Sequence, residues 1–265
     1  MIPPVVDFAW LEAHPEAVLA DVRYYLDGRS AADAYAAGHL AGAGRVDMDE
    51  VLAEPASPEA GRHPLPAPEK FAAGLSAVGI GDDSVVVAYD DAGGAMAGRL
   101  VWLLRMLGHH AAVLDGGLAA WNGELTRDVP TPEAAAFTPK PWPAEALATI
   151  DEAAAGEFVI DARGPERYRG ETEPIDPRAG HIPGAHNYPF VDNLDADGRF
   201  LSPERLRARF CDVTDASKVI SYCGSGITAC HNLLTLEYAG LGRGRLYPGS
   251  WSQYSHTDRV AATTG

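Results

Sequence analysis

The sequence predicts an α/β protein built from two tandem domains, each with a mainly parallel sheet flanked by helices on both faces. Short runs rich in valine and isoleucine alternate with helix-compatible segments, and this pattern occurs twice along the 265 residues. The runs are continuously apolar, which is typical of parallel strands buried on both faces. Ligands of such sheets bind beyond the carboxyl ends of the strands, so functional residues are expected there.

An internal repeat supports the two-domain interpretation. Four pairs of segments match in order and spacing: 19–23 with 159–163, 37–43 with 179–185, 84–90 with 218–223, and 114–121 with 247–254. Asp90 and Trp121 are 31 positions apart, as are Cys223 and Tyr254. A repeat of this length is too long for a solenoid and indicates a domain duplication.

A proline-rich stretch separates the two copies. Residues 128–143 contain five prolines in sixteen positions, which forbids a continuous helix and favours an extended connector. We therefore assign residues 1–128 to a first domain, 129–146 to a linker and 147–265 to a second domain.

Each domain is expected to carry a strand followed by a buried helix. In the first domain the strand ends at Tyr89 and the helix covers 100–107. In the second domain the apolar run 219–222 leads through a short loop into a helix over 228–238. The two helices occupy the same place in the repeat.

The loop of the second domain begins with Cys223, followed by Gly224, Ser225 and Gly226. Backbone N–H groups of such a loop can converge on the sulfur, and the following helix presents its positive end. Both effects favour the thiolate, which is the nucleophilic form. The alternative is a buried cysteine that ends a core strand, but flanking glycines allow a close backbone approach that a strand end does not need. Asp90 stands at the matching position of the first domain, which we expect to be catalytically silent.

Composition excludes several functional classes. The net charge of −16 argues against a nucleic-acid or anionic-membrane partner, since either needs a positive surface. The sequence has neither the ~18–20-residue apolar run of a membrane span nor the features of a signal peptide, so we expect a cytoplasmic protein. Three cysteines without paired spacing indicate no disulfide framework and no zinc site. We expect no metal or organic cofactor, and a monomer.

These motifs together resemble the tandem-domain rhodanese family of sulfurtransferases, over about residues 20–254. The resemblance rests on the Asp-x-Arg after an early strand, the Gly-His-Ile-Pro-Gly-Ala turn, the cysteine loop and the Gly-Ser-Trp segment. The loop Cys-Gly-Ser-Gly-Ile-Thr-Ala is similar to that of the 3-mercaptopyruvate branch, whereas thiosulfate enzymes more often carry basic residues after the cysteine. The resemblance implies two rhodanese-like domains, the first silent and the second catalytic.

It also implies an activity: sulfur moves from 3-mercaptopyruvate through a persulfide on Cys223 to cyanide, a small thiol or a reduced thioredoxin-like protein, and pyruvate leaves. Arg167 and Arg178 fit the family's two substrate-binding arginines, and a planar guanidinium suits a carboxylate. Arg169 competes for this role, and the alternative for all of them is a surface arginine paired with a nearby acid. Loop residues expected to contact the substrate are Gly224, Gly226, Ile227 and Thr228.

The mercaptopyruvate branch further uses an Asp-His-Ser set, for which Asp49, His63 and Ser225 fit. His63 would orient Ser225 and move a proton as pyruvate leaves. The alternative for His63 is an exposed loop histidine, and Asp47 lies two residues from Asp49.

Three other functions are alternatives to this activity. Thiosulfate could be the preferred donor, or the chain could be a non-catalytic sulfur-binding module. A cysteine phosphatase would need an arginine six positions after the cysteine, where this chain has Ala229.

Overall fold

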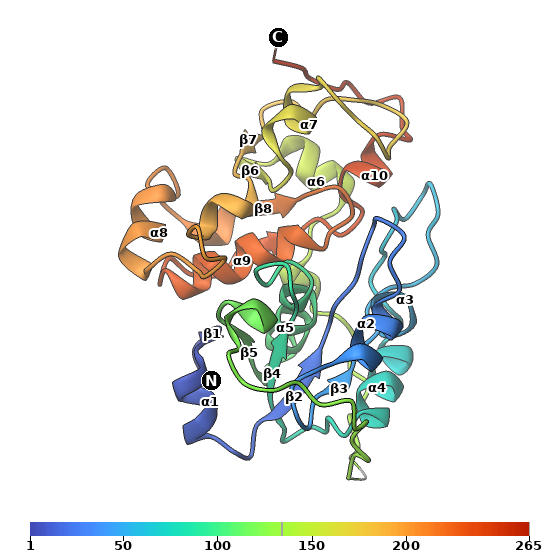
Figure 1. The fold of residues 1–265 in the computed structure, drawn as a ribbon. Helices are drawn as coiled ribbons and strands as arrows, with labels where there is room; N and C mark the ends of the chain where they lie inside the picture. The colour runs from blue at the N-terminus through green and yellow to red at the C-terminus, as the bar shows by residue number, and fades with distance from the viewer. Residues whose placement is uncertain (134, 265) are drawn as a thin grey trace. The chain divides into compact units, whose positions relative to one another are not determined.

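The computed structural model describes residues 1–133 and 135–264, and the chain folds into two compact units (Figure 1). The first unit consists of Met1–Ala53, Pro66–Trp142 and Asp195–Phe200. The second consists of Glu54–Leu65, Pro143–Leu194 and Leu201–Gly265. This division differs from the predicted domain bounds, because residues 54–65 belong to the second unit and residues 195–200 to the first.

The first unit contains a five-stranded sheet with the order β1-β5-β4-β2-β3 and parallel pairing throughout the described strands. Its elements are β1 (Val5–Val6), α1 (Phe8–Ala13), β2 (Val18–Asp21), α2 (Ala31–Ala37), β3 (Gly44–Arg45), α3 (Met48–Val51), α4 (Pro68–Ala77), β4 (Val85–Tyr89), α5 (Ala97–Met106), β5 (His110–Leu114) and the 3-10 turn η1 (Gly117–Ala120).

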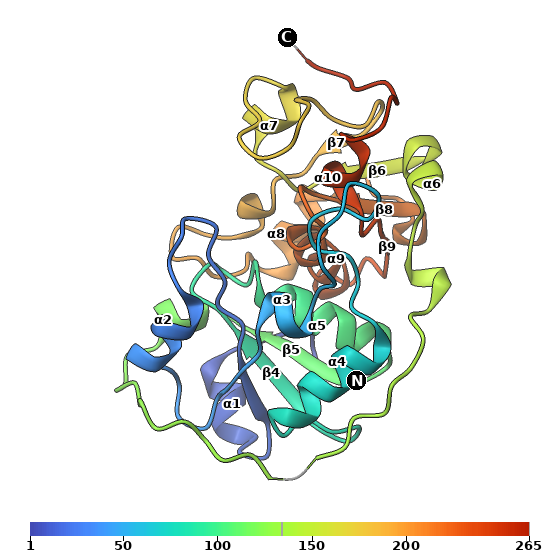
Figure 2. The same ribbon diagram turned by 90° about the vertical axis from the view of Figure 1, so that its right-hand side faces the viewer.

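Both faces of this sheet are covered, as the continuous apolar runs predict. Val86, Val87, Ala88 and Tyr89 of β4 are all fully buried, although successive side chains of a strand point to opposite faces. Val87 and Tyr89 join a core cluster with side chains of α1. Helix α5 packs against β4 and β5, and helices flank the sheet in both views (Figures 1 and 2).

The second unit contains a four-stranded sheet with the order β7-β6-β8-β9 and parallel pairing. Its elements are η2 (Ala144–Ala146), α6 (Ile150–Ala155), β6 (Phe158–Asp161), α7 (Pro165–Arg169), β7 (His186–Asn187), η3 (Phe190–Asn193), α8 (Pro203–Arg209), η4 (Ala216–Lys218), β8 (Val219–Tyr222), α9 (Thr228–Tyr238), β9 (Arg245–Leu246) and α10 (Ser250–Tyr254).

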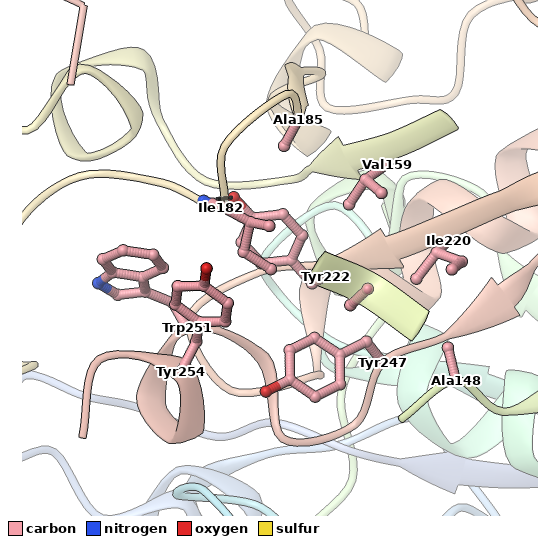
Figure 3. Packing of buried hydrophobic residues seen from close by; sticks show 10 residues of the cluster. Ala148, Val159, Ile182, Ala185, Ile220, Tyr222, Tyr247, Trp251 and Tyr254 are labelled. Carbon is pink, nitrogen blue, oxygen red and sulfur yellow. Dashed lines mark hydrogen bonds between the residues drawn. The ribbon is translucent and has the colours of Figure 1, made fainter. Parts of the chain in front are cut away.

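Aromatic side chains dominate one core cluster of the second unit (Figure 3). Tyr222 of β8 is fully buried, and its hydroxyl accepts a hydrogen bond from the backbone N–H of Ile182. Trp251 and Tyr254 of α10 stack in the same cluster with ring centroids 5.5 Å apart. Helix α10 is thereby fixed to the sheet that carries Cys223.

The repeat predicted from the sequence is confirmed in the packing of both units. Arg23 binds the Asp21 carboxylate through Nη2 at 2.7 Å, and in the second unit Arg163 binds Asp161 in the same way at 2.6 Å. Tyr89, like Tyr222, accepts a backbone N–H with its hydroxyl. The same buried contacts therefore recur at matched positions of the two copies.

The histidines at matched positions of the repeat make the same contacts in both units. His39 stacks on Tyr35 and His181 on Tyr168, each with ring centroids 3.8 Å apart. Nδ1 of each histidine lies within hydrogen-bond distance of the carbonyl oxygen of its stacked tyrosine, at 2.9 and 2.7 Å. Within the described residues, no helix has the length and apolar character needed to cross a membrane.

Candidate active site

Cys223 lies directly beyond the carboxyl end of β8, where the parallel sheet predicts a ligand site. The residue is buried, with 2% of its surface exposed. The backbone N–H of Gly226 donates to Sγ at 3.1 Å. Gly226 has a φ of +82°, and a Cβ at this position would lie 2.6 Å from the carbonyl oxygen of Pro248. The loop closes around the sulfur only because this residue has no side chain.

Three consecutive residues of helix α10 are hydrogen-bonded to the backbone of the loop. Ser250 Oγ accepts the N–H of Cys223 at 3.2 Å. The N–H of Trp251 donates to the Cys223 carbonyl oxygen at 2.9 Å, and the N–H of Ser252 donates to that of Gly224 at 2.8 Å. These bonds fix the backbone on both sides of the sulfur.

Ser250 is in a strained backbone conformation. Its φ of +52° is the only positive value among the described non-glycine residues. A left-handed conformation costs about 1–2 kcal/mol for a residue with a Cβ. Ser250 is fully buried, and its hydroxyl also donates to the Tyr247 carbonyl oxygen at 3.0 Å. Strain of this kind collects at functional sites, where surrounding contacts enforce it.

The remaining loop residues lead into α9, which begins at Thr228 as predicted. Gly224, Ser225 and Ile227 are buried, whereas Thr228 is partly exposed. The amino-terminal end of this 11-residue helix follows the loop, so its positive dipole end is close to the sulfur in sequence. Cys230, in the first turn of the helix, donates its thiol to the Gly226 carbonyl oxygen at 3.2 Å.

Arg167, predicted to bind substrate, lies beside the cysteine loop. A Cβ at Gly224 would lie 3.3 and 3.5 Å from its Nη1 and Nη2. The guanidinium pairs with Glu173 at 2.6 Å and with Asp176 at 3.2 Å. About a fifth of the Arg167 side chain (22%) is exposed, whereas both carboxylates are almost fully buried.

Arg178, the second arginine predicted to bind substrate, is bound to backbone carbonyl oxygens, and its role in substrate binding stays a prediction. Its guanidinium donates to the carbonyl oxygens of Tyr254, Ser255 and Arg259 at 2.8–3.0 Å. It therefore satisfies backbone carbonyls at the carboxyl end of α10 and just beyond. This placement favours a structural role over substrate binding. The competing candidate Arg169 pairs with the exposed carboxylate of Glu171.

A second guanidinium at the loop comes from Arg62, which the sequence did not single out. Its Nη2 would lie 2.9 Å from a Cβ at Gly224, and its Nη1 pairs with the Asp176 carboxylate. Arg62 belongs to the segment Glu54–Leu65, which is part of the second unit. Its position next to His63 in the sequence was the only available signal.

Buried side chains of both charges are connected to the arginines beside the loop. Arg163 binds Asp161 and also Glu173, at 3.2 Å. Burial raises the pKa of Asp176, although Arg62 and Arg167 act in the opposite direction. Arg62 and Arg167 are therefore paired with carboxylates that are almost fully buried.

The three members of the predicted Asp-His-Ser set are in different surroundings. His63 and Ser225 are buried, with 5% and 8% exposed, and both belong to the second unit. Asp49 lies in α3 of the first unit, where burial and the neighbouring Asp47 raise its pKa. Cooperation of the three residues stays a prediction.

The first unit carries an aspartate where the second has its cysteine. Asp90 is fully buried. Its carboxylate accepts four backbone N–H bonds at 2.7–2.8 Å, from Ala92, Gly94, Met96 and Ala97. The loop of the first unit thus also has converging N–H groups, and these bind the carboxylate of Asp90.

No group of three or more His, Cys, Asp or Glu side chains in the described part of the chain could hold a metal ion. The chemistry available at the loop is that of a sulfur nucleophile, backbone N–H donors and guanidinium groups.

Comparison with known proteins agrees with this geometry. The family model for the rhodanese-like domain matches residues 7–124 and 143–257. A probable 3-mercaptopyruvate sulfurtransferase of Pseudomonas aeruginosa is 43% identical over 96% of this chain and 94% of its own. A putative thiosulfate sulfurtransferase of Mycobacterium tuberculosis is 37% identical over 92% and 90%.

A solved structure shares the whole architecture. The crystal structure of a 3-mercaptopyruvate sulfotransferase from Escherichia coli superposes with a TM-score of 0.81 and 31% identity. The match covers 94% of this chain and 99% of the other.

Proposed function

This chain is a sulfurtransferase that belongs to the family of rhodanese-like domains, and from that premise we propose that 3-mercaptopyruvate is its sulfur donor. The sulfur passes through a persulfide on Cys223 to a thiol or cyanide acceptor, and pyruvate is released. The observation that carries this proposal is the Cys223 sulfur itself, which lies at the end of β8, accepts the Gly226 N–H and has Arg167 beside its loop.

In the first half-reaction the Cys223 thiolate attacks the thiol sulfur of the donor. A sulfur–sulfur bond forms and the donor's carbon–sulfur bond breaks. The electron pair goes to the methylene carbon, where the adjacent keto group stabilises it as an enolate. That carbon takes up a proton to give pyruvate, and Cys223 carries the transferred sulfur with its hydrogen.

In the second half-reaction an acceptor thiolate attacks the outer sulfur of the persulfide. The new sulfur–sulfur bond forms on the acceptor, and Cys223 leaves as a thiolate, ready for another donor. Because the donor product leaves before the acceptor reacts, this double displacement gives ping-pong kinetics.

Each proposed role follows from a contact or a residue type. The Gly226 N–H stabilises negative charge on the sulfur in both half-reactions. Arg167 binds the donor carboxylate. His63 orients Ser225 and moves the proton to the departing pyruvate, supported by Asp49. Backbone and side chains of residues 224, 226, 227 and 228 line the donor.

We also propose that the protein acts as a cytoplasmic monomer and that its acceptor is a small thiol or a thioredoxin-like protein. The net charge of −16 supports a soluble partner over a nucleic acid or an anionic membrane.

Mass spectrometry of the intact protein tests the covalent step. Incubation with 3-mercaptopyruvate is expected to add one sulfur atom to the wild type, and an added thiol removes it. Cys223→Ser should gain none, whereas Cys211→Ser, which changes an exposed cysteine, should behave as the wild type. Transfer activity in Cys223→Ser would refute the mechanism, and a stable mass gain without turnover would indicate a sulfur-binding module.

Thiosulfate is the second candidate donor, since a relative is named for it. The ratio of kcat/KM for the two donors decides between them. A higher value for 3-mercaptopyruvate is expected; a higher value for thiosulfate would reassign the donor and leave Cys223 as the sulfur carrier.

A further inference from the structure

We propose that Arg62 is a specificity-determining residue of this site: together with Arg167 it binds the carboxylate of the sulfur donor, and Asp176 positions both guanidinium groups. This inference rests on the proposed donor, 3-mercaptopyruvate, and adds a residue and a charge arrangement to it.

Two guanidinium groups converge on one point of the cysteine loop. A Cβ at Gly224 would lie 2.9 Å from Arg62 Nη2 and 3.3 Å from Arg167 Nη1. Gly224 directly follows Cys223, so both cations lie next to the residue that bears the nucleophile. The carboxylate of a donor bound here would be neutralised by the two guanidinium groups, close to the Cys223 sulfur that attacks the donor.

The backbone of Arg62 is connected to the cysteine loop through Ser252. Its N–H donates to Ser252 Oγ at 2.9 Å, and the N–H of Ser252 donates to the Gly224 carbonyl oxygen at 2.8 Å. A Cβ at Gly61 would lie 2.6 Å from the Gly249 carbonyl oxygen, so the backbone of this segment packs directly on the start of α10. The elements that fix Cys223 therefore fix Arg62 as well.

Two cations near one point repel each other, and Asp176 offsets this by pairing with both, through Oδ1 to Arg62 and Oδ2 to Arg167. The Asp176 side chain is only 2% exposed, whereas the Arg62 and Arg167 side chains are 26% and 22% exposed. The buried carboxylate thus contacts one nitrogen of each guanidinium, Nη1 of Arg62 and Nη2 of Arg167, and part of each arginine side chain is open to solvent. Glu173 binds Nε and Nη2 of Arg167.

This arrangement suits an α-keto acid. A carboxylate accepts paired N–H bonds from one planar guanidinium, and a second guanidinium can bind the remaining carboxylate or keto oxygen. Arg178 is less suited to supply the second group, because each nitrogen of its guanidinium already donates to a backbone carbonyl oxygen.

The main test is Arg62→Ala, with kcat and KM measured for 3-mercaptopyruvate. Hydrogen bonds between charged partners are strong enough that KM should rise about 10- to 100-fold, with a smaller change in kcat. Mercaptoacetone, which has the keto group and thiol but no carboxylate, should show a much smaller loss. Arg169→Ala is the matched control, since it removes a nearby arginine that pairs with an exposed acid.

Two further variants separate positioning from folding. Arg62→Lys keeps the charge without the planar fork and should fall between wild type and Arg62→Ala in KM. Asp176→Asn keeps the shape and removes the charge, and should also raise KM. Because the two residues act as one unit, the double variant Arg62→Ala with Asp176→Asn should cost less than the sum of the single changes. Additive effects would overturn the positioning role of Asp176.

The outcomes for the inference and for the proposed function are distinct. If Arg62→Ala and Arg169→Ala have the same KM while Cys223→Ser is inactive, the role of Arg62 is wrong and the sulfur carrier stands. If Arg62→Ala loses equally with 3-mercaptopyruvate and mercaptoacetone, Arg62 does not recognise the carboxylate. If the wild type does not use 3-mercaptopyruvate, the proposed donor fails and this inference fails with it.

Discussion

Gly226→Ala is expected to damage both the stability and the activity of the protein, and Gly240→Ala provides a matched control. The two glycines lie at opposite ends of α9 and have similar positive φ values, +82° and +76°. An added Cβ at Gly226 would meet the Pro248 carbonyl oxygen at 2.6 Å, whereas at Gly240 no heavy atom lies within 4 Å. The pair therefore separates backbone strain from collision.

The magnitudes follow from these two terms. A left-handed alanine costs about 1–2 kcal/mol, and this cost is common to both variants. Overpacking against a fixed neighbour adds about 1–3 kcal/mol, and this cost falls on Gly226→Ala alone. At about 2–4 °C per kcal/mol for a chain of this size, a difference of ~2 kcal/mol lowers Tm by roughly 4–8 °C more in Gly226→Ala.

Activity provides the second measurement. If the loop moves to relieve the collision, the Gly226 N–H leaves the Cys223 sulfur, and loss of one such donor costs about 10²–10³-fold in kcat. Thermal unfolding and steady-state sulfur transfer are measured on wild type and both variants. Equal Tm and equal kcat for Gly226→Ala and Gly240→Ala would refute the reasoning, because the collision would then have no consequence.

Three further predictions concern contacts outside the loop. Burial lowers the pKa of His181 below its ordinary value of 6.5. Between the two pKa values the histidine is protonated only in the unfolded chain, so the free energy of unfolding falls as pH falls. Urea unfolding at pH 7.5 and 5.5 should show a smaller decline for His181→Asn than for the wild type, and an equal decline would contradict this. Asp90→Ala leaves four N–H groups without their acceptor, of which those of Gly94 and Ala97 are buried. The change should cost about 2–5 kcal/mol of stability, and added sulfate should restore part of this in a thermal melt. An unchanged Tm would show that the carboxylate is not needed there. Arg178→Ala should lower stability by about 2–4 kcal/mol through three lost hydrogen bonds and leave the KM for the donor unchanged, whereas a raised KM would restore the substrate-binding role predicted from the sequence.

The elements near Cys223 were predictable because their signals are local. An apolar run, a Gly-Ser-Gly loop and a helix-compatible segment are adjacent in the sequence, and the helix begins and ends at Thr228 and Tyr238 as expected. The repeat added the matching loop at Asp90. Local order and the repeat were therefore sufficient for the architecture and for the nucleophile.

The surroundings of the loop were predicted less well, because they depend on side-chain direction and on distant segments. Arg167 and Arg178 both fit the motif, yet only the guanidinium of Arg167 lies at Gly224. Arg178 donates to carbonyl oxygens at the end of α10. The spacing of residues in the sequence does not indicate this contact. Arg62 was missed for the same reason, since its contacts are with residues far along the chain.

The anchoring of Arg62 has a consequence for how the protein acquires its structure. Arg62 and Ser252 are hydrogen-bonded although 190 residues separate them in the sequence. Contacts of such high sequence separation form late, since the chain between them must be ordered first. During synthesis, residues 54–65 are made well before α10, so the bond between Arg62 and Ser252 can form only after nearly the whole chain has been synthesised. The second unit accordingly cannot be obtained complete by cutting the chain in the proline-rich connector, because such a cut removes residues 54–65 together with the first unit.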